Sequence, residues 1–236
     1  MLCISHMRLL AIGDIHGCLT AFNTLLDEVC PGKDDILVTL GDYVDRGPDS
    51  RGVIERLLTL KAETTLVTLL GNHDALFRDV LEGESEHFQG WLSVGGISTL
   101  DSYGGKSEVP ESHREFLKSG CRLWYEPEGE QVFFVHGSAF PNLPLAAQPE
   151  EWLLWKRIHD AQWPHESGKT MICGHTAQRS GRPLILPKAI CIDTWAFGEG
   201  WLTCYDVHKG VFTQSNEDGA VRHLTFEEVL GPGVSG

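Results

Sequence analysis

The feature that most constrains this chain is a set of five short polar segments, each of which directly follows an apolar run. The runs are rich in Leu, Ile, Val and Thr, which is typical of buried strands. Because the carboxyl ends of parallel strands meet at one edge of an open α/β sheet, we expect the segments to converge on one ligand-binding crevice. Flanking glycines permit the tight turns, some with φ > 0, that would aim the polar side chains at one point. The segments are Gly13–Gly17, Gly41–Gly47, Gly71–Asp74, His136–Gly137 and Gly174–Thr176.

The spacing of apolar residues in the first third of the chain predicts alternating strands and helices. Strands are predicted at 8–12, 36–40 and 65–70, and helices at 18–30 and 50–60. This β-α-β-α-β order predicts parallel strands that are joined by right-handed crossovers.

The remaining sequence has a different pattern. Residues 83–120 combine many glycines with scattered charges, and we expect a helical, loop-rich insert there rather than a second domain. The whole chain, 1–236, is therefore predicted to form a single domain, with an antiparallel meander in its last quarter and a flexible tail at 231–236. Beyond the insert we predict a helix at 150–158 and strands at 131–135, 170–173, 189–192, 201–207 and 210–214.

Composition excludes several classes of function. The chain has 236 residues, 33 of them acidic and 19 basic, which gives a formal net charge of −14. Such an excess of negative charge disfavours binding to nucleic acid, and no apolar run reaches the ~18 residues of a membrane span. The 7 cysteines are odd in number and include no Cys-x-x-Cys pair, which is typical of a reducing compartment. We therefore predict a cytoplasmic protein that binds neither nucleic acid nor membranes, and its oligomeric state stays open.

The polar segments contain a set of metal-competent donors. Oxygen and imidazole donors without thiolate suit Mn²⁺, Fe or Zn²⁺ better than Ca²⁺ or Mg²⁺ alone. Six donors are too many for one tetrahedral ion, but they suffice for two ions if one carboxylate bridges them. Asp14 and His16 lie two residues apart, so a locally extended chain would place both on one side. The candidate ligands are Asp14, His16, Asp42, Asn72, His136 and His175.

Other polar residues fit phosphate chemistry. The planar guanidinium of Arg46 matches phosphate oxygens, and Arg157 is a candidate for a second phosphate clamp. His73, next to Asn72, is placed to protonate a leaving oxygen, and Asp45 is a candidate for orienting its imidazole. Taken singly, each such residue is more simply explained as a surface ion pair, a helix cap or a solvated side chain. Their joint order after five strands favours a site.

The chain resembles the phosphoprotein phosphatase branch of the calcineurin-like metallophosphoesterases in the order and spacing of five motifs across roughly residues 8–205. These motifs are GDIHG at 13–17, GDYVDRG at 41–47, GNHD at 71–74, HG at 136–137 and GHT at 174–176. The compact size and the stretch WLSVGGISTLDSYG at 91–104 resemble the small bacterial and phage serine/threonine protein phosphatases. The resemblance implies an α/β fold with four layers (α/β/β/α), in which two mixed sheets lie between helices.

The resemblance also implies a role for each candidate residue. A first metal ion would take Asp14, His16 and Asp42, and a second would take Asp42, Asn72, His136 and His175. Arg46 and Arg157 would bind phosphate, His73 would act as general acid, and Asp45 would support it. Two divalent ions are implied, with manganese expected and iron or zinc as alternatives. A hydroxide bridging them would attack the phosphoester of a phosphorylated protein or a small phosphoester directly.

Two departures from the family pattern concern the choice of substrate. The third motif reads GNHD, where most protein phosphatases of the family read GNHE. The segment IDTWAFGEGW at 192–201 replaces the long aromatic loop of the eukaryotic enzymes.

Two alternatives to a serine/threonine phosphatase stay open. The first is a symmetric dinucleoside polyphosphate hydrolase on the same scaffold. Those relatives commonly carry Ala at the position of Asp45, so Asp45 favours the monoesterase, whereas GNHD favours the dinucleotide enzyme slightly. The second is a non-catalytic metal-site module that binds a protein partner. Such modules usually lose ligands, and here all six are present.

Overall fold

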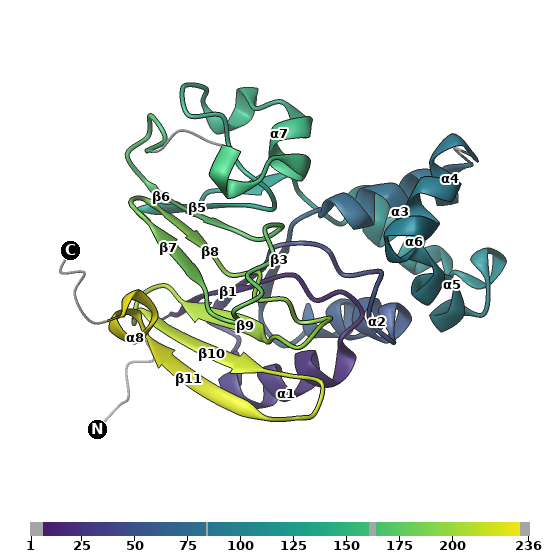
Figure 1. Ribbon diagram of the computed structural model, residues 1–236, viewed down its shortest axis with the longest axis horizontal. Coiled ribbons are helices and arrows are strands. Elements are labelled where there is room, and N and C mark those ends of the chain that lie inside the picture. The colour runs from purple at the N-terminus through teal and green to yellow at the C-terminus, as the bar shows by residue number, and fades with distance from the viewer. Residues whose placement is uncertain (1–6, 84, 161–163, 232–236) are drawn as a thin grey trace.

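Two mixed β-sheets lie face to face and form the centre of the fold (Figure 1). The computed structural model describes residues 7–83, 85–160 and 164–231. The predicted flexible tail therefore lies outside the described residues, apart from Gly231.

The first sheet has the strand order β11-β10-β9-β1-β2-β3. Strands β1 (Leu9–Ile12), β2 (Ile36–Thr39) and β3 (Thr65–Thr68) run parallel and are connected by helices α1 (Leu19–Val29) and α2 (Ser50–Leu60). The predicted β-α-β-α-β unit is thus confirmed. On the other side of β1 lie three antiparallel strands, β9 (Leu202–Asp206), β10 (Val211–Ser215) and β11 (Val221–Thr225), and the short helix α8 (Phe226–Leu230) follows them.

The second sheet has the order β4-β5-β6-β8-β7. Its parallel centre is formed by β5 (Val132–Val135), β6 (Thr170–Cys173) and β8 (Ala189–Cys191), with β4 (Trp124–Tyr125) and β7 (Leu184–Leu186) antiparallel at the edges. The expected meander is therefore correct only from β9 onward, because β8 joins this sheet beside β6. All residues of β8 are buried, as is usual for a strand covered on both faces.

Side chains of alternate residues divide the core between layers. In β1, Leu9 and Ala11 face the second sheet, whereas Leu10 and Ile12 pack against the helices. On the other side, Phe133 of β5 packs against helix α7 (Glu150–Trp155) through Leu153. These layers confirm the predicted four-layer α/β/β/α architecture.

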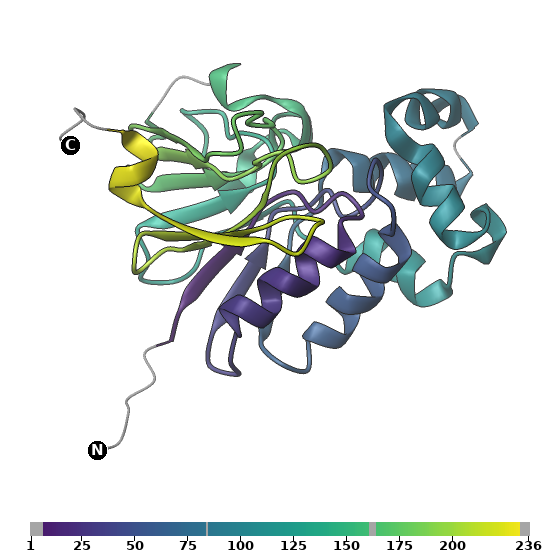
Figure 2. The same cartoon turned by 60° about the horizontal axis from the view of Figure 1, so that its bottom comes forward.

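Helices α3 to α6 gather in a separate lobe beside the two sheets (Figure 2). The predicted insert at 83–120 is helical over most of its length, and α3 precedes it as a helix that the apolar pattern did not predict. The lobe consists of α3 (Asn72–Glu82), α4 (Ser85–Trp91), an irregular helical turn (Leu92–Gly96), α5 (Ile97–Tyr103), a 3₁₀ turn (Lys106–Glu108) and α6 (Glu111–Ser119).

Helix α7 ends three residues before its predicted end at residue 158. The carbonyls of Trp152 and Leu153 accept hydrogen bonds from the N–H groups of Ser138 and Gly137, at 3.1 and 2.6 Å. In a continued helix these carbonyls would accept from residues 156 and 157 instead. Arg157 therefore lies beyond the helix, where a 3₁₀ turn (Ile158–Asp160) follows.

In the part of the chain that the structure describes, no helix combines the length and the apolar character needed to cross a bilayer.

One ion pair fastens the first strand to its neighbours. Asp35, which is buried, accepts hydrogen bonds from the Arg8 N–H at 2.9 Å, from the Arg8 guanidinium at 2.6 and 3.0 Å, and from the Gly32 N–H at 2.8 Å. Burial acts to raise the pKa of Asp35, but the hydrogen bonds from Arg8 and Gly32 outweigh it and lower the pKa. The ionised carboxylate thus adds stability above the unfolded-state pKa of about 3.9, and this stability is lost as the pH falls through the folded-state pKa.

Replacing Asp35 tests whether its ionised carboxylate contributes to the stability of the fold. We expect Asp35→Ala to lower the free energy of unfolding by about 2 kcal/mol at pH 7, because charged hydrogen bonds are lost. Urea denaturation should show a smaller difference from wild type at pH 3 than at pH 7. The control Asp34→Ala, at an exposed position, should be near neutral at both pH values. An equal loss at both pH values would contradict the ionic contribution.

Candidate metal centre and phosphate site

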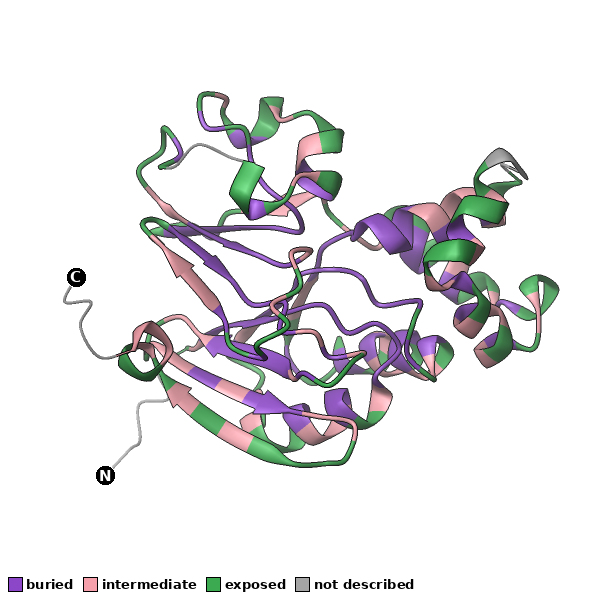
Figure 3. Ribbon diagram, in the orientation of Figure 1, coloured by how far each residue is buried: buried purple, intermediate pink, exposed green. Residues whose placement is uncertain are grey.

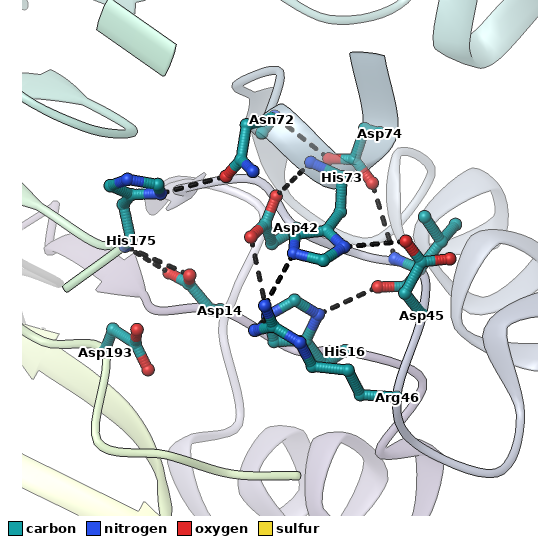
Figure 4. A network of polar contacts seen from close by, with 12 residues as sticks. Asp14, His16, Asp42, Asp45, Arg46, Asn72, His73, Asp74, His175 and Asp193 are labelled. Atoms are coloured by element: carbon teal, nitrogen blue, oxygen red, sulfur yellow. Dashed lines mark hydrogen bonds and ion pairs between the residues drawn. The ribbon is translucent and has the colours of Figure 1, made fainter. Parts of the chain in front are cut away.

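Side chains from four of the five polar segments lie together in Figure 4, and the contacts of His136 add the fifth segment to the same cluster. Asn72 Oδ1 lies 2.9 Å from His136 Nε2 and 2.9 Å from His175 Nδ1. Asp42 lies between them and the first segment, since its carboxylate oxygens are 3.5 Å from His136 Nε2 and 3.4 Å from His16 Nε2. Residues from after β1, β2, β3, β5 and β6 thus share one cluster, as the strand pattern predicted.

Asp42 belongs to two compact groups of donor atoms. His16, Asp42 and His73 form one, and Asp42, His136 and His175 form the other, with all donor atoms of each group within 4.8 Å of one another. The first group contains His16 and Asp42 of the expected first ligand set together with His73, and the assignment of Asp14 to this set stays a prediction. The Asp14 carboxylate accepts the His175 backbone N–H at 3.0 and 3.1 Å. The side chain of Asp14 does not cap helix α1, because the N-terminus of α1 begins at the N-cap residue Cys18 without a side-chain hydrogen bond.

The imidazoles of the three predicted ligand histidines are oriented by backbone carbonyls. In each ring one nitrogen lies within hydrogen-bond distance of a carbonyl, so it donates there, while the other nitrogen faces the cluster. Ligand histidines typically have this arrangement, because the second hydrogen bond fixes the tautomer and the ring plane. The pairs are His16 Nδ1 with Val44 O at 2.8 Å, His136 Nδ1 with Leu40 O at 2.8 Å, and His175 Nε2 with Trp155 O at 3.1 Å.

Buried negative charge at the cluster fits a divalent cation. Burial, and then the neighbouring carboxylates of Asp193 and Asp42, raises the pKa of Asp14 well above its usual range. Burial acts to raise the pKa of Asp42 as well, but the surrounding imidazoles, His136 first, lower it well below its ordinary value. Buried carboxylates this close together are stable as anions only beside cations. The donor set, with imidazole, carboxylate and amide groups but no thiolate, suits Mn²⁺, Fe or Zn²⁺.

Several of the motif residues have left-handed backbone conformations, which are uncommon for residues other than glycine. At His16 φ is 47°, so the extended conformation expected for 14–16 is wrong, and the hydrogen bond to Val44 orients this ring instead. Such conformations cost about 1–3 kcal/mol each and are concentrated at functional sites. The residues are His16, Asp42, Asp45, Arg46 and His175.

At two motif glycines, a carboxylate oxygen lies so close to the backbone that only glycine fits, although φ is not positive there. A Cβ atom at Gly71 would lie 2.1 Å from Asp42 Oδ1, and one at Gly174 would lie 2.0 Å from Asp14 Oδ1. Any larger residue would therefore displace a candidate ligand. At Gly17 and Gly41, by contrast, φ is 65° and 99°, as the predicted tight turns require.

His73 and Asp45 form a buried pair. His73 Nδ1 lies 2.7 Å from Asp45 Oδ2, so its N–H donates to the carboxylate while Nε2 faces the cluster. Burial acts to lower the pKa of His73, but the nearby Asp42 charge and the Asp45 hydrogen bond raise it above its ordinary value. This pairing is the one that the sequence predicted for an acid and its support.

The predicted phosphate-binding arginines line one cavity of about 420 Å³, together with His175. The guanidinium of Arg46 lies between two imidazoles, with its nitrogens 2.7 Å from His16 Nε2 and 2.7 Å from His73 Nε2. Arg157 is exposed at the rim of the same cavity.

Two buried carboxylates beside the cluster were not predicted as site residues. Asp193 lies two residues beyond the end of β8 and directly follows the strand predicted at 189–192, so the same rule would have found it. Burial raises the pKa of Asp193 to about 7. Asp74, the residue that departs from the GNHE pattern, accepts the N–H groups of Tyr43 at 2.9 Å and Gly71 at 3.0 Å. Its carboxylate thus connects two motif loops, and it is not among the residues that line the cavity. Burial raises the pKa of Asp74 to about 8.

The loops that follow β1 and β2 are themselves buried, which is uncommon for connecting segments (Figure 3). Their polar side chains therefore hold fixed positions.

Comparison with known proteins agrees with this geometry. The family model for calcineurin-like phosphoesterases matches residues 7–180. Serine/threonine-protein phosphatase 1 of Salmonella typhimurium is 36% identical over 204 residues, which cover 81% of this chain and 88% of that protein. A symmetrical bis(5'-nucleosyl)-tetraphosphatase of Pseudomonas fluorescens is 29% identical over 164 residues, covering 65% of this chain and 52% of that protein. The chain thus spans about half the length, or less, of several curated relatives that it matches.

Solved structures share the fold. A cold-active protein-tyrosine phosphatase from a Shewanella species has a TM-score of 0.65 at 17% identity, covering 93% of this chain and 80% of that one. A serine/threonine phosphatase from Saccharomyces cerevisiae has a TM-score of 0.61 at 17% identity, covering 98% and 83%. The family match over residues 7–180 and the similarity to the Salmonella phosphatase show that the chain belongs to the calcineurin-like phosphoesterase family.

Proposed function

We propose that this protein is a phosphomonoesterase that uses two divalent ions, manganese by preference, and acts on phosphoserine and phosphothreonine in proteins. The buried His73–Asp45 pair carries this proposal, because His73 lies beside Asp42, which both donor groups share, and a monoester needs an acid at its leaving oxygen. The ions, when bound, polarise the phosphoryl group and lower the pKa of a coordinated water. Their proposed ligands are Asp14, His16, Asp42, Asn72, His136 and His175.

The chain's own residues bind and protonate the substrate in this proposal. Arg46 and Arg157 bind phosphate oxygens from the cavity and stabilise the charge that builds up in the transition state. His73 Nε2 delivers a proton to the serine or threonine oxygen as it departs. Asp45 holds His73 Nδ1 and thereby orients Nε2, which accepts from the Arg46 guanidinium in this structure and carries the proton once Arg46 binds the phosphate instead.

A symmetric dinucleoside polyphosphate hydrolase is the second candidate, favoured by the names of several relatives. Two observations support the monoesterase against it. The Salmonella serine/threonine phosphatase is covered over most of its length, unlike those relatives. Asp45, where the dinucleotide enzymes commonly carry Ala, is present and hydrogen-bonded to His73.

Replacing the proposed acid gives a direct test. We expect His73→Asn to reduce kcat on the order of 100-fold for phenyl phosphate, whose leaving oxygen needs a proton. The loss should be much smaller for 2,4-dinitrophenyl phosphate, because that leaving group departs as a stable anion. Bound manganese, measured by mass spectrometry, should stay at the wild-type level.

The same variant separates two roles for His73, because the ring also belongs to a compact donor group. Loss of one equivalent of metal would make His73 a ligand, and equal losses on both esters would remove the acid role. His223→Asn changes an exposed histidine outside the site and should behave as wild type in both assays.

Substrate preference separates the two candidate functions. We expect the manganese-loaded protein to hydrolyse a phosphothreonine peptide with a kcat/KM at least about 10-fold above that for diadenosine tetraphosphate. The reason is that the proposed acid His73, supported by Asp45, assists the departure of the threonine oxygen more than that of a nucleotide phosphate. The reverse order would favour the dinucleotide enzyme. Absence of hydrolysis of both, and of p-nitrophenyl phosphate, at full metal occupancy would favour a non-catalytic binding module.

A further inference from the structure

Three arginines line the cavity, and the proposed function assigns only two of them to the reacting phosphate. Arg46, Arg157 and Arg179 all line it, and the lining residues that the structure describes include no carboxylate, although the chain as a whole carries a charge of −14. We propose that Arg179 forms a subsite for a second phosphate group of the substrate, next to the phosphate that is hydrolysed. This inference rests on the proposed function, which assigns Arg46 and Arg157 to the reacting phosphate.

Two aromatic residues from the segment after β8 support the arginines. The guanidinium of Arg46 lies 4.5 Å from the ring centre of Phe197, and that of Arg179 lies 5.4 Å from the ring centre of Trp195. The two rings contact each other edge to face, with centroids 6.2 Å apart. Phe197 also packs on His16, with ring centroids 4.9 Å apart, which ties this row to the metal-donor cluster. A continuous row therefore leads from the cluster to Arg179.

Trp195 is held in place, so it can orient the arginine above it. Its backbone is left-handed, with φ at 65°, and its N–H donates to Asp193 Oδ1 at 3.1 Å. A Cβ atom at Gly198 would lie 2.3 Å from the indole, so the ring packs closely on that glycine. Arg179 itself is exposed, and stacking on a fixed ring reduces the entropy that the arginine loses when it binds an anion.

The ligand chemistry is a pair of phosphates linked or held within one cavity of about 420 Å³. Two sources supply it, a polyphosphate chain and a doubly phosphorylated peptide. Both would pair the reacting phosphate with Arg46 and the second with Arg179, because a guanidinium binds phosphate oxygens in pairs.

Competition with tripolyphosphate tests the subsite. We expect tripolyphosphate to inhibit p-nitrophenyl phosphate hydrolysis more tightly than orthophosphate, and Arg179→Ala to reduce the ratio of the two inhibition constants about tenfold. Chelation of manganese acts equally on wild type and variant and so cancels in the comparison. Arg51→Ala, which removes a guanidinium paired with Glu55 on helix α2, is the control and should keep the wild-type ratio. Calorimetric binding of tripolyphosphate should change in parallel.

Peptide substrates then identify the source. A lower KM for a doubly than for a singly phosphorylated peptide, lost in Arg179→Ala, would assign a peptide. The same pattern for diadenosine tetraphosphate alone would assign a polyphosphate chain. An unchanged ratio of inhibition constants in Arg179→Ala would overturn the subsite. Wild-type protein that binds tripolyphosphate through Arg179 but hydrolyses no ester would overturn the proposed function instead.

A separate set of contacts carries a second inference, on the helical lobe. Asp45 is fully buried, and two side chains of the lobe donate hydrogen bonds to it. Trp91 Nε1 lies 3.0 and 2.9 Å from its two oxygens, and Thr99 Oγ1 donates to Oδ1 at 2.7 Å. The Asp45 N–H donates back to Thr99 Oγ1 at 2.8 Å. We infer that Trp91 and Thr99 are positioning residues for the proposed acid His73.

The lobe contacts fix the direction of the Asp45 carboxylate. Thr99 donates to Oδ1 and Trp91 Nε1 donates to both oxygens, so the carboxylate is fixed with Oδ2 directed at His73 Nδ1. The indole of Trp91 is fixed in turn, because it stacks on Phe77 with centroids 5.1 Å apart. Rotation of the carboxylate would release His73, and the proton on Nε2 would lose its direction.

Leaving-group dependence distinguishes positioning from packing. We expect Trp91→Phe, which keeps the stacking ring, and Thr99→Val to slow phenyl phosphate about tenfold more than 2,4-dinitrophenyl phosphate, as His73→Asn does. Thr99→Ser keeps the hydroxyl and should restore the wild-type ratio. A loss of folding alone would reduce both esters equally.

The two possible failures are distinguishable. If His73→Asn shows the leaving-group effect but Trp91→Phe and Thr99→Val keep the wild-type ratio, the positioning role is wrong. If His73→Asn shows no such effect, the proposed acid itself is wrong. Circular dichroism of each variant checks folding, and the Thr99→Val and Thr99→Ser pair keeps the test decisive if Trp91→Phe does not fold.

Discussion

The carboxylate of Asp42 is the point on which the geometry of the site depends. It lies 3.4 Å from His16, 3.5 Å from His136, and accepts the His73 backbone N–H at 2.9 Å. Four segments of the chain are thus placed relative to one buried anion. Burying a charge is costly, and the imidazoles around Asp42 are what stabilise it. The same arrangement leaves ring nitrogens and oxygens directed at two neighbouring positions, as a pair of cations would require.

Local backbone strain accompanies this convergence. Candidate ligands such as Asp42 and His175 have φ of 52° and 62°, conformations in which glycine would be less strained. Glycine cannot replace them because the side chains supply the donors. The glycines stand instead at neighbouring positions such as Gly71 and Gly174, where a side chain would collide with a carboxylate. The motifs therefore combine donor residues in strained backbone conformations with neighbouring glycines that leave room for the carboxylates. Both are needed to bring the donors together.

Features governed by local patterns could be predicted from the sequence, and features governed by distant contacts could not. Apolar periodicity gave β1 to β3 and helices α1 and α2, and the rule that polar segments follow strands brought the candidate site together. Helix α3 was not predicted, because its first turn, Asn72–Asp74, is buried but polar and therefore lacks the usual apolar stripe. The early end of α7 depends on carbonyls taken by Gly137 and Ser138, and the Trp91–Asp45 contact joins residues 46 positions apart. Neither has a local signal.

Arg46 is the residue at which the two accessory elements meet. Its N–H donates to Gly95 O at 3.2 Å, at the kink of the helical lobe, while its guanidinium lies over Phe197 from the segment after β8. The lobe and the segment after β8 are far apart in the sequence, yet both contact the same side chain. A change in either would therefore move Arg46, and it would also reach the candidate metal ligand His16, which contacts both Arg46 and Phe197. The lobe also contacts Asp45 through Trp91 and Thr99, so the two accessory elements together surround the side chains to which phosphate binding and proton donation are proposed.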